Sequence, residues 1–233
     1  LLLAAFDHRH VFIDPAPDAE VAYAERARMF ALPRSSWDDY DRGAISAGGG
    51  VFPRTLKSIP LSPEIRALLG VQAESLTPAE LISCILKTPA ELLYLGGIGT
   101  YVKGSGETHA DVGDKANDAV RVNGRDLRVK VVGEGANLGL TQAGRIEFAL
   151  GGGRVETDAI DNSAGVDSSD HEVNIKILTG ALERTGVLTR KSRDKLLRSM
   201  VDDVARHVLA HNYDQTLALS LLEMDSPGEL ETH

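Results

Sequence analysis

Residues 129–141, with the sequence VKVVGEGANLGLT, carry the pattern that decides the fold class. Residues 127–132 are predicted to form a strand, and the strand gives way to small residues. Thr141 follows, and its hydroxyl can cap a helix that extends to Leu150. A second strand predicted at 155–160 would complete a βαβ unit, which favours a parallel sheet with helices on its faces.

The same alternation of strands and helices extends in both directions from this stretch. Further strands are predicted at 1–6, 11–13 and 92–95, and helices at 19–29, 63–70, 78–86 and 108–120. Asp18, Ser62 and Thr77 mark the starts of the first three of these helices, since their side chains can cap a first turn. The run at 1–6 is wholly apolar, as in a central parallel strand that is covered on both faces. Beyond residue 169 the pattern is helical. The sequence therefore predicts an α/β protein with a doubly wound, Rossmann-like parallel sheet, followed by a helical C-terminal extension.

This pattern suggests two parts. Residues 1–168 are predicted to form a partial dinucleotide-binding domain, with an insertion around 33–60 that is rich in loop-forming residues. Residues 169–233 form the helical extension. No Gly-rich fingerprint joins the first strand to the first helix, so the predicted domain lacks the first βα unit of a Rossmann fold.

Composition excludes several classes of protein. The chain has 233 residues, 42% of them hydrophobic, and a net charge of −9. This acidic balance argues against a nucleic-acid surface. No apolar run reaches the roughly 18 residues that a membrane span requires. Cys84 is the only cysteine and cannot form an internal disulfide, which favours a cytoplasmic location.

Two predicted strands end in residues that suit a dinucleotide. Asp7 follows the strand at 1–6, where an acid can accept hydrogen bonds from the adenine ribose, although it could equally be a turn residue. The neighbouring His8 and Arg9 could instead accept a 2′-phosphate. Gly96, Gly97 and Gly99 follow the strand at 92–95 in the sequence GGIGT, where a pyrophosphate or ribose could approach the backbone closely. This turn has neither Walker A nor Rossmann spacing, so a simple tight bend is the alternative.

Two further stretches carry polar side chains. Asn137 lies in the small-residue loop and can both donate and accept hydrogen bonds, as a ribose or a carboxamide requires. Residues 160–169, with the sequence IDNSAGVDSS, lead into a helix start whose N–H groups and hydroxyls suit an anion such as a carboxylate.

These stretches resemble glutamate dehydrogenases. The GEGAN core at 133–137 is similar to the AEGAN segment of that family, and residues 162–172 resemble its NAGGV segment with downstream Ser and Glu. Residues 4–177 as a whole resemble the C-terminal catalytic part of the large NAD-specific glutamate dehydrogenases of bacteria. The stretches that carry this likeness are 6–10, 33–37, 96–103 and 161–176. Ser163 and Ala164 depart from the smaller dehydrogenases, which have Ala and Gly there.

The resemblance implies roles for particular residues. Asp7 would face the adenine ribose of NAD, and the turn containing Gly96, Gly97 and Gly99 would line the dinucleotide cleft. Asn137 would contact the nicotinamide ribose, and Asn162 would lie beside the nicotinamide. Ser169 matches the serine that hydrogen-bonds the side-chain carboxylate of L-glutamate or 2-oxoglutarate.

The resemblance also implies an activity and its missing parts. The activity is NAD-dependent oxidative deamination of L-glutamate to 2-oxoglutarate and ammonia, by a homo-oligomer in full-length form. No residue here matches the family's catalytic lysine and aspartate, which lie upstream, so the chain is expected to be an inactive piece of a larger polypeptide. The alternatives are a non-catalytic nucleotide-binding fragment and another amino-acid dehydrogenase.

Two pairs of histidines are candidate metal ligands. His207 and His211 are four residues apart and could share a helix face, but they lack the glutamate of a zinc-protease helix. His8 and His10, near Asp14, are a second pair. Surface or structural roles explain both pairs more simply, so no metal site is predicted.

Overall fold

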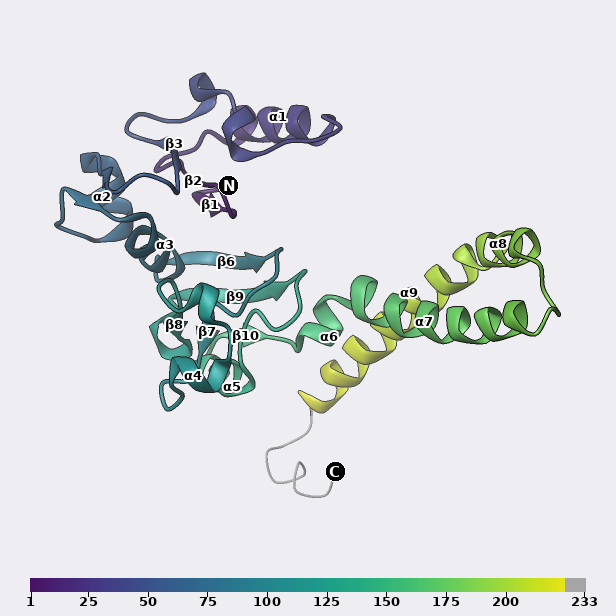
Figure 1. Cartoon of the computed structure of the whole chain (residues 1–233). Coiled ribbons are helices and arrows are strands. Elements are labelled where there is room, and N and C mark those ends of the chain that lie inside the picture. Colours follow the sequence, from purple (N-terminus) through teal and green to yellow (C-terminus); the bar gives the residue numbers. More distant parts are fainter. Residues whose placement is uncertain (225–233) are drawn as a thin grey trace. The chain divides into compact units, whose positions relative to one another are not determined.

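The computed structural model describes residues 1–224, which divide between two compact units (Figure 1). Unit 1 comprises residues 1–93, 99–132 and 139–155. Unit 2 comprises residues 94–98, 133–138 and, within the described part, 156–224. The last nine residues of the predicted extension, 225–233, lie outside the described part. The predicted division into two domains at residue 168 stays a prediction.

The elements alternate along most of the chain. The helices are α1 Ala19–Phe30, α2 Pro63–Leu69, α3 Pro78–Leu86, α4 His109–Val112, α5 Gln142–Leu150, α6 Asp158–Asp161, α7 Ser163–Arg184, α8 Arg190–Ser199 and α9 Val201–Leu222. The strands are β1 Ala4–Phe6, β2 His10–Ile13, β3 Gly50–Pro53, β4 Ile59–Pro60, β5 Ser75–Leu76, β6 Ala90–Leu95, β7 Val102–Lys103, β8 Val122–Asn123, β9 Val129–Glu134 and β10 Arg154–Val155.

Capping residues set the helix boundaries, as the sequence predicted. The side chain of Asp18 accepts hydrogen bonds from the first turn of α1, and Ser62 does the same for α2. Thr77 and Glu80 form a reciprocal capping box at the start of α3. The Thr141 hydroxyl accepts from the Gly144 N–H at the start of α5. These contacts satisfy N–H groups that have no partner inside the helix.

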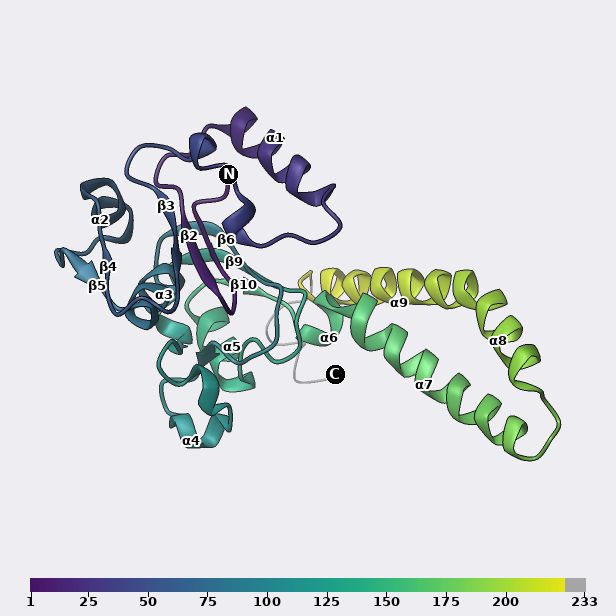
Figure 2. The same cartoon turned by 45° about the horizontal axis from the view of Figure 1, so that its top comes forward.

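The first strand differs from its prediction. β1 pairs with β2 antiparallel, with Ala4 opposite Ile13, and β2 pairs antiparallel with β3 (Figure 2). β1 is therefore a half-buried edge strand in this sheet, and the prediction of a central parallel strand at 1–6 was wrong. The reason is a tight turn at residues 7–10, where the Asp7 N–H donates to the His10 carbonyl oxygen and the chain reverses.

The predicted insertion at 33–60 is ordered and partly regular. The Trp37 ring stacks on Phe12 of β2 at a centroid distance of 5.1 Å, and Tyr40 lies 4.7 Å from the same ring. Phe12 is fully buried in the core of unit 1. Residues 50–53 form β3, which the sequence pattern did not indicate. Burial of these aromatic rings holds a segment that has few helical or strand signals of its own.

Parallel pairing occurs where the sequence predicted a βαβ unit. β9 and β10 are parallel, with Arg154 opposite Val131, and α5 connects them. β7 and β8 form a second parallel pair. The chain is thus a mixed α/β protein with parallel strand pairs, although its described strands lie in several small sheets and those at 4–13 and 50–53 are antiparallel.

Two predicted elements are shorter than expected. The helix predicted at 108–120 ends at Val112, because Gly113 adopts the left-handed conformation that terminates helices. The strand predicted at 155–160 ends at Val155. Thr157 then precedes the short helix α6.

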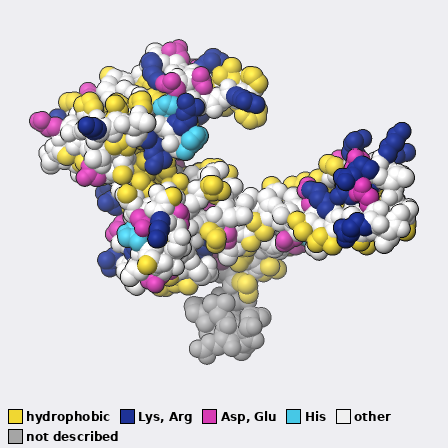
Figure 3. Space-filling model, in the orientation of Figure 1, with side chains coloured by type: hydrophobic (Ala, Val, Ile, Leu, Met, Phe, Trp, Pro, Cys, Tyr) yellow, Lys and Arg dark blue, Asp and Glu magenta, His cyan; other side chains and the backbone are white. Residues whose placement is uncertain are grey.

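Unit 2 is largely helical, as predicted for the C-terminal part. α7 and α9 lie side by side, and α8 joins them at the end far from α6 (Figures 1 and 2). Lys and Arg side chains gather over α8 (Figure 3), where Arg190 and Arg193 contact Glu183 of α7. None of the helices in residues 1–224 is long and apolar enough to cross a membrane.

The hydrogen bonds of Glu25 in α1 are expected to contribute to the stability of unit 1. This buried carboxylate accepts from Arg28 at 2.6 Å and from the Asp41 N–H at 2.7 Å, which lowers its pKa below the ordinary 4.5. Glu25→Gln is expected to reduce the free energy of unfolding by about 1–2 kcal/mol at pH 7, since Arg28 is half exposed. A carboxylate whose pKa is lowered on folding contributes its full stabilisation above the ordinary pKa of 4.5 and loses it as the pH falls through the lowered pKa. The deficit of Glu25→Gln in the free energy of unfolding should therefore shrink over that pH range.

Urea unfolding at several pH values measures this effect. The exposed Glu74, whose side chain makes no hydrogen bond among the described contacts, supplies the matched control Glu74→Gln. A deficit of equal size for the two variants, or one that does not change with pH, would contradict the assigned contact.

Candidate functional site

Asp7 lies in unit 1, in the turn between β1 and β2. Its Oδ1 atom accepts from the N–H groups of Arg9 and His10, each at 2.7 Å. The side chain of Arg54 donates to the Asp7 carbonyl oxygen at 2.8 Å. The carboxylate thus holds the turn through one oxygen, in the way Asp side chains commonly do. Its predicted role at the adenine ribose stays a prediction.

The glycine turn after β6 combines an open and a crowded position. A Cβ atom added at Gly97 would meet no atom within 4 Å. Gly99, in unit 1, has a φ of +119°, and an added Cβ would lie 2.4 Å from the amide nitrogen of Asn117. Asn117 and the Thr100 N–H both donate to Asp114 and lower its pKa. Gly99 is therefore required by the local backbone, whereas Gly97 leaves a stretch of backbone accessible.

Asn137 and Asn162 meet in unit 2. The Asn162 amide nitrogen donates to the Asn137 Oδ1 atom at 2.7 Å. Asn137 comes from the loop after β9, and Asn162 lies between α6 and α7. Among the described residues, the Asn137 amide nitrogen and the Asn162 carbonyl oxygen have no hydrogen-bond partner. The pair therefore offers donors and an acceptor side by side, as a carboxamide or a ribose requires.

Two aspartates of α6 hold the loop that carries Asn137. Asp161 accepts from the N–H of Glu134 at 2.9 Å, and Asp158 accepts from the N–H of Leu138 at 3.0 Å. Leu138 has a φ of +57°, so the second contact fixes an uncommon backbone conformation. The two carboxylates thus hold the loop on both sides of Asn137.

A contact with β6 positions the same loop. The Gly135 N–H donates to the Leu95 carbonyl oxygen at 2.9 Å, and a Cβ at Gly135 would lie 2.0 Å from the Tyr94 hydroxyl. The Asn137 loop thus approaches the end of β6 closely at Gly135. Gly96 and Gly97 follow Leu95 directly, and they lie with the Asn137 loop in one compact unit.

The role of Asp158 and Asp161 was not predicted, because residues 155–160 have the pattern expected of a strand. A usable signal was present. Thr157 followed by an acid is typical of a helix start, since a Thr at the N-cap and acids in the first turn both stabilise that end.

Ser169 lies in the first half of α7 and is exposed. It belongs to unit 2, together with Gly96, Gly97, Asn137 and Asn162. Asp7 and Gly99 belong to unit 1. The structure therefore brings the two asparagines into direct contact, while the roles predicted for all seven residues remain predictions.

The sequence matches known proteins along nearly its whole length. A sequence model of the family described as bacterial NAD-glutamate dehydrogenase, catalytic domain, matches residues 1–222. The NAD-specific glutamate dehydrogenase of Pseudomonas aeruginosa is 60% identical over 222 residues, which cover 95% of this chain and 14% of that protein. The enzyme of the same name from Mycobacterium tuberculosis is 56% identical over 238 residues, covering 100% of this chain and 15% of that protein. The enzyme of the same name from Halomonas elongata is 55% identical over 223 residues, which cover 96% of this chain and 14% of that protein. The chain thus spans about one seventh of the length of these relatives.

Proposed function

The chain belongs to the family of bacterial NAD-glutamate dehydrogenase catalytic domains, and we propose that it holds the nicotinamide end of NAD in such an enzyme. The reaction proposed is oxidative deamination of L-glutamate to 2-oxoglutarate and ammonia. The observation that carries this proposal is the hydrogen-bonded pair of Asn137 and Asn162. When bound, NAD supplies the acceptor for the hydride that leaves the α-carbon of glutamate.

The residues present fit the cofactor in three respects. The asparagine pair retains amide N–H donors and a carbonyl acceptor, which match the polar atoms of a carboxamide and a ribose. Gly97 leaves its backbone open to a closely approaching group. Ile98 and Leu138, which are 90% and 64% exposed, offer apolar surface for the flat faces of the rings.

In this proposal the residues of the chain orient reactants. Asn137 and Asn162 fix the ring so that one face is presented to the substrate, which limits the hydride to a single direction of transfer. Ser169 donates a hydrogen bond to the side-chain carboxylate of glutamate and so selects an acidic substrate. A base and a cation at the α-carbon are further requirements of the reaction, and no residue of this chain is assigned to them.

The fold proposed to support this arrangement is Rossmann-like. The β9–α5–β10 unit supports it, since two parallel strands with a connecting helix are its repeating element. The loop with Asn137 follows the carboxyl end of β9, which is where ligands bind in open α/β sheets.

Titration of this protein with NADH, monitored through nicotinamide fluorescence, tests the proposal. Asn137→Ala and Asn162→Ala should each raise the Kd for NADH by about three- to tenfold, which corresponds to the loss of one or two hydrogen bonds. Asn174→Ala is the matched control, because Asn174 lies further along α7 and, within residues 1–224, its side chain bonds only to the Asp170 carbonyl oxygen. Its Kd should equal that of the unaltered protein. Saturable binding that neither Asn137→Ala nor Asn162→Ala weakens would remove the pair from the cofactor site.

A further inference from the structure

Three side chains with metal-binding atoms converge between α7 and α9 in unit 2. Asp167 and His171 are four residues apart on α7, and residues at that spacing share one face of a helix. His211 lies opposite them on α9, 44 residues along the chain from Asp167. One candidate ligand atom from each residue lies within 4.8 Å of the other two.

The separations suit a shared metal ion. The Nδ1 atom of His211 is 3.0 Å from Asp167 Oδ2, and the Nε2 atom of His171 is 3.4 Å from Asp167 Oδ1. A zinc ion bound at about 2.1 Å by each ligand keeps the ligand atoms of a tetrahedral site about 3.4 Å apart. Both separations are close to this value, and the candidate ligand atoms of all three residues lie within 4.8 Å of one another.

His171 has a further property that points to a ligand. Its Nε2 atom is buried and makes no hydrogen bond among the described residues, although it lies 3.4 Å from Asp167 Oδ1. A buried polar atom without a partner is costly, and a metal ion would satisfy it. The rings of His171 and His211 are stacked with centroids 5.5 Å apart.

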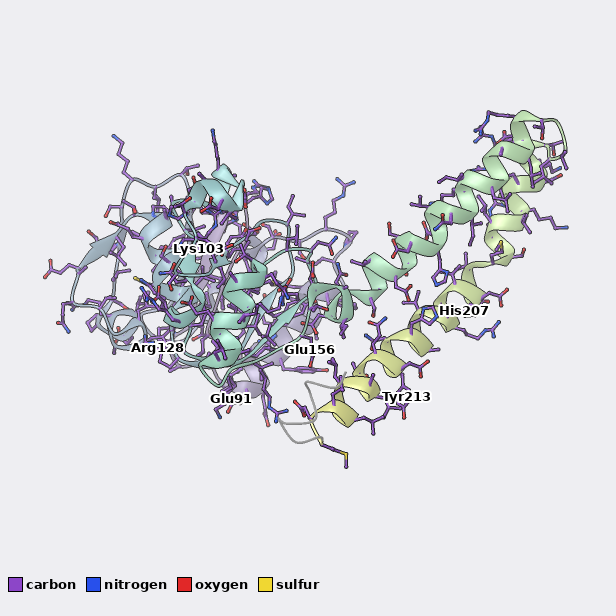
Figure 4. The ribbon with its side chains drawn as sticks, turned by 90° about the horizontal axis from the view of Figure 1, so that it is seen from below. Glu91, Lys103, Arg128, Glu156, His207 and Tyr213 are labelled. Atoms are coloured by element: carbon purple, nitrogen blue, oxygen red, sulfur yellow. The ribbon has the colours of Figure 1, made fainter. Side chains whose placement is uncertain are left out.

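A third histidine borders the cluster. The ring of His207 lies 5.9 Å from that of His171 and 6.1 Å from that of His211, measured between centroids. It projects from α9 one turn before His211 (Figure 4). Two pairs at four-residue spacing thus face each other across α7 and α9, an arrangement that helical bundles use to build metal sites.

We propose that Asp167, His171 and His211 form a binding site for a divalent transition metal ion of the zinc class, which bridges α7 and α9. Two imidazoles and one carboxylate are ligands for zinc, whereas calcium and magnesium require mostly oxygen ligands. Three protein ligands would leave one further ligand position of a tetrahedral zinc ion, and the His207 ring borders the cluster. The site is independent of the proposed dinucleotide function, since it shares no residue with Asn137 or Asn162.

The bridge would have a structural consequence. α7 and α9 pack along one another, and several apolar side chains of the pair remain exposed, including Val173, Ile177 and Leu209. A metal ion bound to both helices stabilises the folded state in proportion to its affinity, because the unfolded chain cannot present the three ligands together.

Isothermal titration of the purified protein, without a polyhistidine tag, by Zn²⁺ tests the proposal. One ion per chain is expected to bind, and His171→Ala and His211→Ala should each weaken binding by more than about tenfold. Binding of Co²⁺ provides a second measurement, since a site of low coordination number gives visible absorption that both variants should lose. His8→Ala is the matched control, because His8 is exposed in unit 1, and its binding should be unchanged.

The variants are expected to fold. The side chains of His171 and His211 are 33% and 44% exposed, so their truncation leaves no closed cavity. Circular dichroism in the absence of metal should show equal helix content for all variants. Asp167→Asn, which keeps the shape of the side chain and removes its charge, provides a third variant with the same expected loss. The proposal is overturned if the unaltered protein binds no Zn²⁺ or if His171→Ala and His211→Ala bind it as tightly as His8→Ala does.

Discussion

Ser169→Ala in the full-length enzyme is expected to raise the KM for L-glutamate by about 10- to 100-fold and to change the KM for NAD by less than about twofold. The first figure corresponds to the loss of a hydrogen bond to a charged carboxylate, which contributes about 1.5–3 kcal/mol. Ser169 is exposed on α7, so its removal costs little in packing. Steady-state kinetics with each substrate varied in turn measures both constants.

Ser168→Ala is the matched control for this prediction. Ser168 precedes Ser169 on the same helix and therefore points about 100° away around the axis. Its replacement removes an equivalent hydroxyl from the same segment and should leave both KM values within about twofold of those of the unaltered enzyme. Similar increases in the two KM values for Ser169→Ala would show a general disturbance of α7 and would contradict a contact with glutamate.

Gly144→Ala is expected to lower the free energy of unfolding by about 1–3 kcal/mol, although alanine favours helices over glycine by about 1 kcal/mol. Gly144 lies in the first turn of α5, where an added Cβ would lie 2.8 Å from the Lys103 carbonyl carbon and 3.0 Å from its Cα. These are backbone atoms of β7, which cannot rotate away as a side chain can. The clash should outweigh the gain in helix propensity and lower the Tm by several degrees.

Gly180→Ala in α7 is the matched control, since it makes the same change inside another helix. An added Cβ there would meet only the end of the Arg184 side chain, at 3.6 Å. Its expected effect is a stabilisation of about 1 kcal/mol, which comes from helix propensity alone. Thermal and urea unfolding of the two variants should therefore give changes of opposite sign. Stabilisation by both substitutions would show that α5 does not approach the β7 backbone as closely as described.

Local signals in the sequence predicted much of the fold. Asp18, Ser62, Thr77 and Thr141 marked helix starts correctly, because a cap acts on N–H groups two or three residues away. The prediction of a central parallel strand at residues 1–6 was wrong. An apolar run has the same composition in a parallel or an antiparallel sheet, and the reversal at Asp7 depends on a turn of only a few residues.

The sequence likewise predicted some features of the candidate site and missed others. Asn137 was recognised from its own chemistry, whereas Asn162 and Ser169 were identified through a resemblance to a family. That Asn137 and Asn162 touch was beyond any local pattern, since 25 residues separate them in the chain. The contributions of Asp158 and Asp161 to the Asn137 loop were likewise visible only once α6 and that loop were seen together.

The histidines of α7 and α9 show what the sequence alone determines and what depends on the tertiary structure. It determined the four-residue spacings of Asp167 with His171 and of His207 with His211, and each spacing places two side chains on one helix face. Only the tertiary structure decided that the two faces meet, with His211 3.0 Å from Asp167. Helical periodicity orders side chains within one helix, but which helix faces which depends on burial summed over many distant residues.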